Sequence, residues 1–242
     1  MRSWKQWGWG LSIATVTAVT AFGVASWQAN ASPGTPSPSS PPLTLPRVSD
    51  PKVAPEPAAG TGSEALTSAE VDKARAVAVT PELASSARDA TGKAGPEYLM
   101  ADLDEDTGRH AELYYYDYRT DKLIKQVVDL KTGTIAKSFS AKGMQPPASQ
   151  QEASAAFDLL LADPLSAGFK QAYRKAAGQE FAGKEGLTVT AHIYTARPAD
   201  KGAPQCGAKR CVQLIVQTTD GHFISVNDLI IDLSGRTVAR LT

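Results

Sequence analysis

The same order of helix and strand patterns occurs twice in this chain, and this repetition limits its folds more than any other feature. Residues 67–70 and 149–152 each place a hydroxyl side chain three residues before a glutamate, the arrangement of a capping box at a helix start. Alternating apolar and polar residues, typical of half-buried strands, follow each helix pattern. Residues 127–137 also align without a gap over 230–240, with Asp-Leu, a turn and Thr at equivalent positions. We therefore expect two copies of one α+β unit.

The first unit is predicted to span residues 64–143. A Thr-Pro pair at 80–81 provides a second helix start, with proline at the first helical position. The remaining residues alternate as strands of an antiparallel meander do. The predicted elements are helices at 68–79 and 81–90 and strands at 98–103, 111–118, 123–130 and 134–140.

The second unit is predicted to span residues 144–242 and to repeat this order. An Asp-Gly pair at 220–221 favours a hairpin turn, because both residues tolerate positive φ. We expect each unit to pack its helix on a four-stranded antiparallel sheet. The predicted elements are helices at 150–161 and 164–178 and strands at 187–195, 211–219, 223–233 and 236–241.

The N-terminus has the pattern of an export signal. Arg2 and Lys5 precede the mostly apolar segment 7–27, and a small-x-small tripeptide ends at Ala31. We predict a signal peptide at residues 1–31, cleaved after Ala31, and a mature protein that is secreted or associated with the cell envelope. The alternative is an uncleaved membrane anchor, since the apolar segment approaches the length that spans a bilayer.

Residues 32–63 contain nine of the sixteen prolines, interspersed with small and polar residues. Such a segment has too little apolar surface to fold by itself. We predict a disordered Pro/Ser-rich linker between the signal peptide and the first unit.

The composition excludes several classes of protein. The chain has 25 basic and 25 acidic residues and no basic stripe, which argues against nucleic-acid binding. His110, His192 and His222 are far apart in sequence, and neither a Gly-x-Ser-x-Gly turn nor a Gly-rich phosphate loop is present. We expect a protein that is not an enzyme and has no catalytic residue, cofactor or metal. The remaining alternative is an enzyme that uses the three histidines and a metal ion.

The two cysteines, Cys206 and Cys211, flank a four-residue loop. Outside the cytoplasm, two cysteines so placed are expected to form a disulfide. A redox motif usually has two intervening residues, and a metal site would need further ligands. We predict a structural disulfide that contributes about 2 kcal/mol.

Four tyrosines are concentrated in one predicted strand. Alternation puts Tyr114, Tyr116 and Tyr118 on one face and Tyr115 on the other. One interpretation is packing in the core or between the units. The other is an exposed surface for a protein partner, formed by Tyr114, Tyr115, Tyr116 and Tyr118.

The chain resembles the N-terminal modules of copper amine oxidases. Leu-Thr-Ser-Ala-Glu-Val at 66–71, with Gln-Val-Val-Asp-Leu-Lys-Thr-Gly at 126–133, is similar to the first of two such modules. Gln-Pro-Pro at 145–147, Glu152 and Ala-Asp-Pro at 162–164 resemble the start of the second. The resemblance covers roughly residues 64–175, and it implies two tandem cystatin-like units, each a helix across a curved antiparallel sheet.

The sequence also departs from that family. The oxidases carry their chemistry in a large C-terminal β-sandwich, for which this chain has no room before Thr242. No tyrosine follows an asparagine, as the family's quinone requires, and there is no His-x-His pair for copper. We therefore carry over no catalytic residue and no copper ligand. The second half is also similar to small exported proteins of high-GC bacteria, through residues 206–214 and 231–234.

Together these features predict a non-catalytic exported protein that acts by protein binding or assembly at the cell envelope. The alternative is a secreted inhibitor or chaperone-like regulator of an extracellular enzyme. A protein partner is expected but not identified by the sequence. No contact with nucleic acid is expected, nor with membrane once the signal peptide is cleaved.

Overall fold

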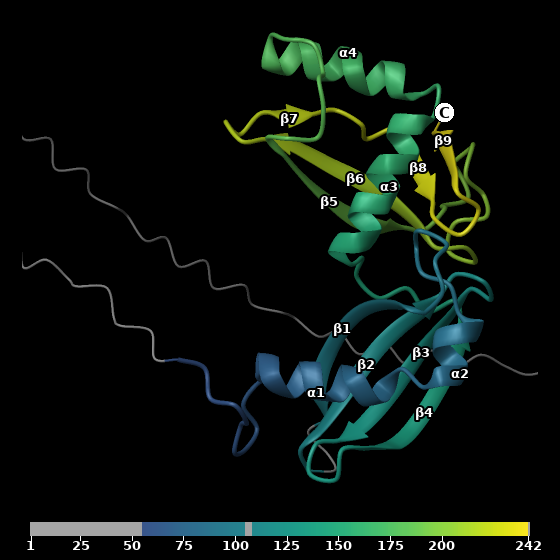
Figure 1. Ribbon diagram of the computed structural model, residues 1–242. Coiled ribbons are helices and arrows are strands. Elements are labelled where there is room, and N and C mark those ends of the chain that lie inside the picture. Colours follow the sequence, from purple (N-terminus) through teal and green to yellow (C-terminus); the bar gives the residue numbers. More distant parts are fainter. Residues whose placement is uncertain (1–54, 105–107, 242) are drawn as a thin grey trace, which may run out of the picture. The chain divides into compact units, whose positions relative to one another are not determined.

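The computed structural model describes residues 55–104 and 108–241, which contain both α and β structure (Figure 1). The chain divides into two units, Met1–Lys52 and Val53–Thr242, and every described residue belongs to the second. The predicted signal peptide and the first part of the predicted linker lie outside the described residues. Within the described ranges, no helix is both long enough and apolar enough to cross a membrane.

The first sheet is a four-stranded antiparallel meander in the order β1-β2-β3-β4, as predicted. A tight turn joins β3 to β4, in which Gly133 has φ +67° and its N–H donates to the carbonyl of Asp129. A non-glycine residue would be strained in that left-handed conformation. The strands are β1 Glu97–Asp104, β2 His110–Asp117, β3 Lys122–Asp129 and β4 Thr134–Lys142.

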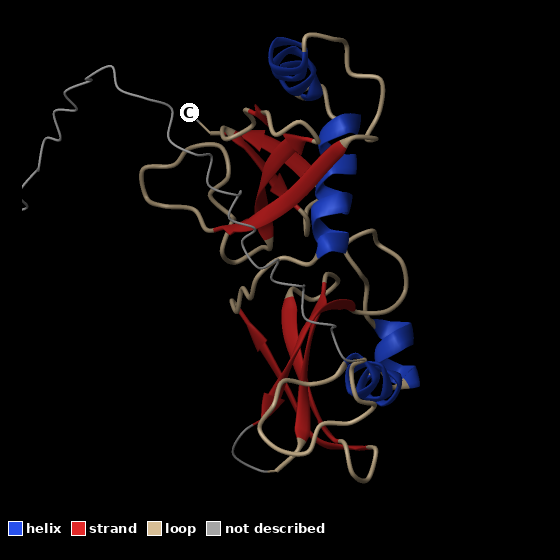
Figure 2. Ribbon diagram, turned by 90° about the vertical axis from the view of Figure 1, so that its left-hand side faces the viewer, coloured by secondary structure: helices blue, strands red, loops and turns tan. Residues whose placement is uncertain are grey.

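Helix α1, Ser68–Ala78, begins at the predicted capping box and packs on β2 and β3. Thr67 Oγ1 accepts from the N–H of Glu70, and the Glu70 carboxylate accepts from the N–H of Thr67. Ala74 and Ala78 are fully buried against the sheet. Figure 2 shows the helix against one face of the first sheet.

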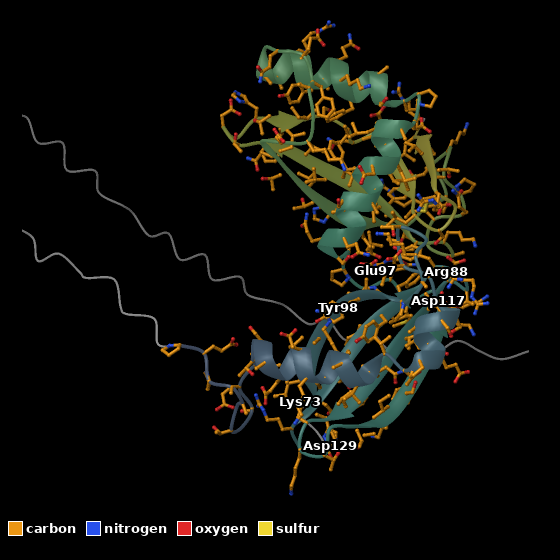
Figure 3. The ribbon with its side chains drawn as sticks, in the orientation of Figure 1. Lys73, Arg88, Glu97, Tyr98, Asp117 and Asp129 are labelled. Carbon is orange, nitrogen blue, oxygen red and sulfur yellow. A yellow bond between two sulfur atoms is a disulfide. The ribbon has the colours of Figure 1, made fainter. Side chains whose placement is uncertain are left out.

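Helix α2, Pro81–Ser86, starts at the predicted Thr-Pro pair but ends four residues before the predicted boundary at residue 90. The helix ends early because hydrogen bonds to the end of β2 fix the backbone at Arg88 in a non-helical position. The Asp117 carboxylate accepts from the N–H of Arg88, and the carbonyl of Arg88 accepts from the N–H of Tyr118. Figure 3 labels Arg88 and Asp117 at this end of the first sheet.

Residues 55–63, the end of the predicted linker, contact the start of α1. Gly60 N–H donates to Glu70 Oε1, and Arg109 Nη1 donates to the carbonyl of Gly62. Arg109 also forms a bidentate ion pair with Glu70, with Nε–Oε1 at 2.6 Å and Nη2–Oε2 at 2.7 Å. The ion pair therefore connects the entering chain, α1 and the start of β2.

The second sheet has the order β5-β6-β8-β9, with β7 also paired to β6. It has five strands where the sequence predicted four, because the predicted strand at 223–233 is divided. Between its two parts, Val226 turns inward and is buried, and its carbonyl accepts from the N–H of Leu229. The strands are β5 Leu187–Tyr194, β6 Cys211–Thr218, β7 Phe223–Ile224, β8 Leu229–Asp232 and β9 Thr237–Arg240.

Helix α3, Gln150–Ala162, begins at the second predicted capping box and packs on β5, β6 and β8. Helix α4, Ser166–Ala177, follows and ends at Gly178, as predicted. Phe157 of α3 and Phe169 of α4 meet edge to face in the core, with ring centroids 5.2 Å apart. The second half therefore also packs helices on an antiparallel sheet, with two helices as in the first half and one more strand.

Candidate functional site

The tyrosines of β2 and the residue after it lie in two different environments. Tyr115 points toward α1 and belongs to the apolar core of the first half, with 1% of its surface exposed. Tyr116, on the opposite face, is also 1% exposed. Tyr114 is half-buried and donates its hydroxyl proton to Glu112 at 2.6 Å. Because successive residues of a strand face opposite sides, no single surface presents all four. The burial supports packing and does not support a partner surface of four exposed tyrosines.

A buried ion pair lies beneath Tyr116 and Tyr118. Arg210 Nε is 2.5 Å from Glu152 Oε1 and Nη2 is 2.8 Å from Oε2, and neither side chain has any exposed surface. The other guanidinium N–H groups donate to the side chain of Gln145 and to the carbonyls of residues 146–147. All the hydrogen-bonding capacity of this cation is therefore used within the protein.

The first sheet covers this ion pair. The Tyr118 hydroxyl donates to Glu152 Oε1 at 2.5 Å, and the Arg210 guanidinium lies 5.1 Å from the centre of the Tyr116 ring. The two tyrosine rings meet edge to face at 4.9 Å. Burial raises the pKa of Tyr116 to about 12 and that of Tyr118 well above its usual value, so both stay protonated at neutral pH.

A second buried carboxylate, that of Glu97, lies nearby at the start of β1 (Figure 3). It accepts hydrogen bonds from Ser149 Oγ at 2.8 Å, Gln151 Nε2 at 2.9 Å and the N–H of Ala90 at 3.2 Å. Burial raises its pKa, and the negative charge of Glu152 adds to the shift. Serine and glutamine from the second half thus bind a carboxylate of the first.

These contacts form one polar cluster that joins the two halves. At its rim, Lys209 forms an ion pair with Asp121 at 2.5 Å, and Arg236 donates to the carbonyl of Ala90 at 3.0 Å. Because the guanidinium and carboxylate groups of the cluster are hydrogen-bonded within the protein, the cluster stabilises the junction and offers no free cation to a ligand. Among the described residues, the buried Tyr116 hydroxyl has no hydrogen-bond partner. The junction cluster consists of Glu97, Tyr116, Tyr118, Glu152 and Arg210.

The outer strand of the first sheet, β4, presents a different surface. Within the described residues it pairs with β3 alone, and every residue of Thr134–Lys142 except Ile135 is exposed (Figure 1). Phe139 is 52% exposed, an unusual position for a large aromatic side chain. We refer to Thr134–Lys142 as the β4 edge.

The β4 edge is positively charged. Lys142 lies directly opposite Lys122 in the strand register, a like-charge pair that destabilises a sheet. Lys137 is exposed in the same strand. In the described part of the chain, no acidic side chain lies within ion-pair distance of these three lysines. The edge therefore has unneutralised positive charge beside unpaired backbone groups.

The three histidines do not come together as a site. His110 begins β2, His192 is exposed in β5, and His222 lies 3.0 Å from Asp220 at the turn before β7. Across residues 55–104 and 108–241, no three His, Cys, Asp or Glu side chains are grouped in a way that could hold a metal ion.

The predicted disulfide is confirmed. Cys206 and Cys211 are joined with an S–S distance of 2.06 Å, and Cys211 is fully buried at the start of β6. The bond lies in a small apolar cluster with Tyr194, Ala203 and Ile230. It fixes the loop that carries Arg210 and so supports the junction cluster.

No protein-family model matches the chain, and no curated protein matches it. Among solved structures, the chain is similar to a copper-containing benzylamine oxidase from Hansenula polymorpha, with a TM-score of 0.39 and 12% sequence identity. The match covers 74% of this chain and 29% of the oxidase chain, so this chain spans less than a third of that protein's length. A copper amine oxidase is thus one of its structural neighbours, at low similarity.

Proposed function

We propose that this chain is a non-catalytic exported protein that binds a protein partner at the cell envelope. In this proposal its two halves are tandem cystatin-like modules that resemble the N-terminal modules of copper amine oxidases. The helix over one face of each antiparallel sheet and the aligned residues 127–137 and 230–240 support the tandem arrangement. The disulfide between Cys206 and Cys211 supports export, because such bonds persist outside the cytoplasm.

The proposal of protein binding rests on the β4 edge. An edge strand has a row of unpaired N–H and C=O groups, and an extended segment of another protein can add to the sheet there. The exposed Phe139 offers an apolar contact, and Lys122, Lys137 and Lys142 offer positive charge. The partner that fits this edge presents an extended segment with acidic side chains.

Site-specific crosslinking in the producing cells tests this proposal. A photo-crosslinking residue replaces Phe139 in the full chain, and a second protein carries it at Phe223, which is 66% exposed in the other sheet. We expect the protein with the crosslinker at position 139 to give one discrete adduct. The protein with the crosslinker at position 223 is the matched control. Reversing the charge of Lys137 and Lys142 to glutamate should abolish the adduct.

The control for charge is the same reversal at Lys170 and Lys175, which are exposed on α4. It should leave the adduct intact, because α4 packs on α3 and β7 of the second half and not on the first sheet's outer strand. Equal adducts from Phe139 and Phe223, or an adduct that survives reversal at Lys137 and Lys142, would contradict the proposal. Identification of the adduct as an extracellular enzyme would favour the regulator function.

A further inference from the structure

A hollow of about 530 Å³ lies between α1, α2 and the start of β1. Its wall is mainly apolar, formed by alanines of the two helices, Pro96 and the rings of Tyr98 and Tyr115. Sites for small ligands have this size and composition, with a few polar groups that fix the orientation of the ligand. The proposed function makes no use of this hollow.

Tyr115 has a hydroxyl group that the fold leaves unsatisfied. Its oxygen is buried and has no hydrogen-bond partner among the described residues. Leaving a buried hydroxyl unpaired carries a cost in stability. Burial raises the pKa of Tyr115, so the group remains a neutral donor at neutral pH.

Arg75 supplies a cation at the same hollow. Its guanidinium lies 4.2 Å from the centre of the Tyr98 ring, a cation–π contact that fixes its position. In the part of the chain that the structure describes, no carboxylate lies within ion-pair distance of it. The Tyr98 ring in turn meets the Tyr115 ring edge to face, with centroids 5.7 Å apart, so the cation and both tyrosines border the same hollow.

From this convergence we propose that the hollow binds a small monocarboxylic acid with an apolar body. The carboxylate accepts hydrogen bonds from the Tyr115 hydroxyl and the Arg75 guanidinium, neither of which has an acceptor among residues 55–104 and 108–241. The apolar body packs on Pro96 and the ring of Tyr98. Asp72 also borders the hollow and opposes an anion there, so it limits the affinity.

Calorimetry on the full chain tests this proposal, with phenylacetate as the probe and its neutral amide, phenylacetamide, as the control ligand. We expect saturable binding of phenylacetate and about tenfold weaker binding of the amide, since a charge-assisted hydrogen bond is lost. Arg75→Gln and Tyr115→Phe should each weaken phenylacetate binding about fivefold or more. Asp72→Asn should strengthen it, and Lys170→Gln on the exposed face of α4 should leave it unchanged.

The melting temperature gives an independent test of the Tyr115 hydroxyl. Because the unliganded protein leaves this group unpaired, Tyr115→Phe should keep or raise the melting temperature while it weakens binding. A lower melting temperature for Tyr115→Phe would show that the hydroxyl has a partner in the folded protein, and would overturn the proposal. Equal binding of acid and amide, or no saturable binding of phenylacetate, would also overturn it. None of these outcomes bears on partner binding by the β4 edge.

Discussion

Arg210 and Glu152 face each other in a bidentate ion pair that has no contact with solvent. Taking two charges out of water is costly, and their mutual attraction offsets that cost only where other hydrogen bonds complete both groups. Here Gln145 and the carbonyls of residues 146–147 accept the remaining hydrogen bonds of the guanidinium. The Tyr118 hydroxyl and the capping N–H of Ser149 donate to the carboxylate. The pair is thus built into the junction from both halves of the protein.

Removing one partner of this pair should destabilise the protein strongly. Arg210→Met leaves Glu152 buried without its counter-ion, and we expect the free energy of unfolding to fall by about 3–5 kcal/mol. Urea unfolding measures this change. The matched control is Arg174→Met, because Arg174 pairs with Glu180 on the exposed surface and should contribute below about 1 kcal/mol. Equal losses in the two variants would contradict the assignment of a buried pair.

The Tyr118 hydroxyl should contribute to the same junction by donating to Glu152. Tyr118→Phe removes one charge-assisted hydrogen bond without changing the ring, and we expect a loss of about 1.5–2 kcal/mol in the free energy of unfolding. Tyr114→Phe, four residues earlier in β2, is the control, since its hydroxyl donates to the carboxylate of Glu112 in a half-exposed setting. Water can replace that bond, so its loss should be smaller. A larger loss for Tyr114→Phe would argue against the junction.

The Glu70–Arg109 pair should make stability depend on pH in the acid range. The hydrogen bond from Arg109 lowers the pKa of Glu70 to about 2, from an ordinary value near 4.5. A lowered pKa in the folded state stabilises the protein above the unfolded pKa, and this contribution is lost as pH falls from about 5 toward 2. Since solvent screens part of the interaction, we expect a loss of about 2 kcal/mol.

Urea unfolding from pH 7 to pH 2 measures this dependence. Glu70→Gln should flatten the fall in stability over that range and should lower stability at pH 7. Glu180→Gln, in an exposed pair, should reproduce the wild-type profile within error. If stability falls with pH in the Glu70→Gln variant as steeply as in the wild-type protein, the acid sensitivity belongs to another group.

Much of the fold could be predicted from local sequence patterns. The two capping boxes fixed the starts of α1 and α3, because a hydroxyl residue and a glutamate three residues later satisfy the first N–H groups of a helix. Alternation placed most strands within two residues of their observed ends. The predicted end of α2 was wrong, because the observed end is set by Asp117, a residue distant in sequence that binds Arg88. The break between β7 and β8 likewise depends on the burial of Val226 in the core.

The junction cluster was not predicted, for a physical reason. Glu152 was identified through its capping role, but nothing near it in sequence indicates its partner, 58 residues away. Arginine is rarely buried, and the burial of Arg210 depends on Tyr116 and Tyr118 from the other half. The alternation of the tyrosines separated their two faces correctly. Both faces are buried, because α1 covers Tyr115 and the second half covers Tyr116, and the contact with the second half has no local pattern in the sequence.

The disulfide between Cys206 and Cys211 should stabilise the protein modestly, because it closes a short loop. In the chain-entropy model, a loop of this length contributes about 2 kcal/mol to the free energy of unfolding. We expect Cys206→Ala with Cys211→Ala to lose about this amount in urea unfolding. Wild-type protein treated with a reductant is the control, since it loses the bond and keeps both side-chain volumes.

The loop that the disulfide closes carries Arg210, so the loss of the bond should also affect the junction cluster. Arg210→Met should lower the free energy of unfolding less in the double alanine variant than in the wild-type protein. Without the disulfide, the loop is more mobile and positions the buried cation less firmly. Strict additivity of the two losses would show that the disulfide and the ion pair act independently. Free thiols that titrate in the folded, untreated protein would contradict the bond itself.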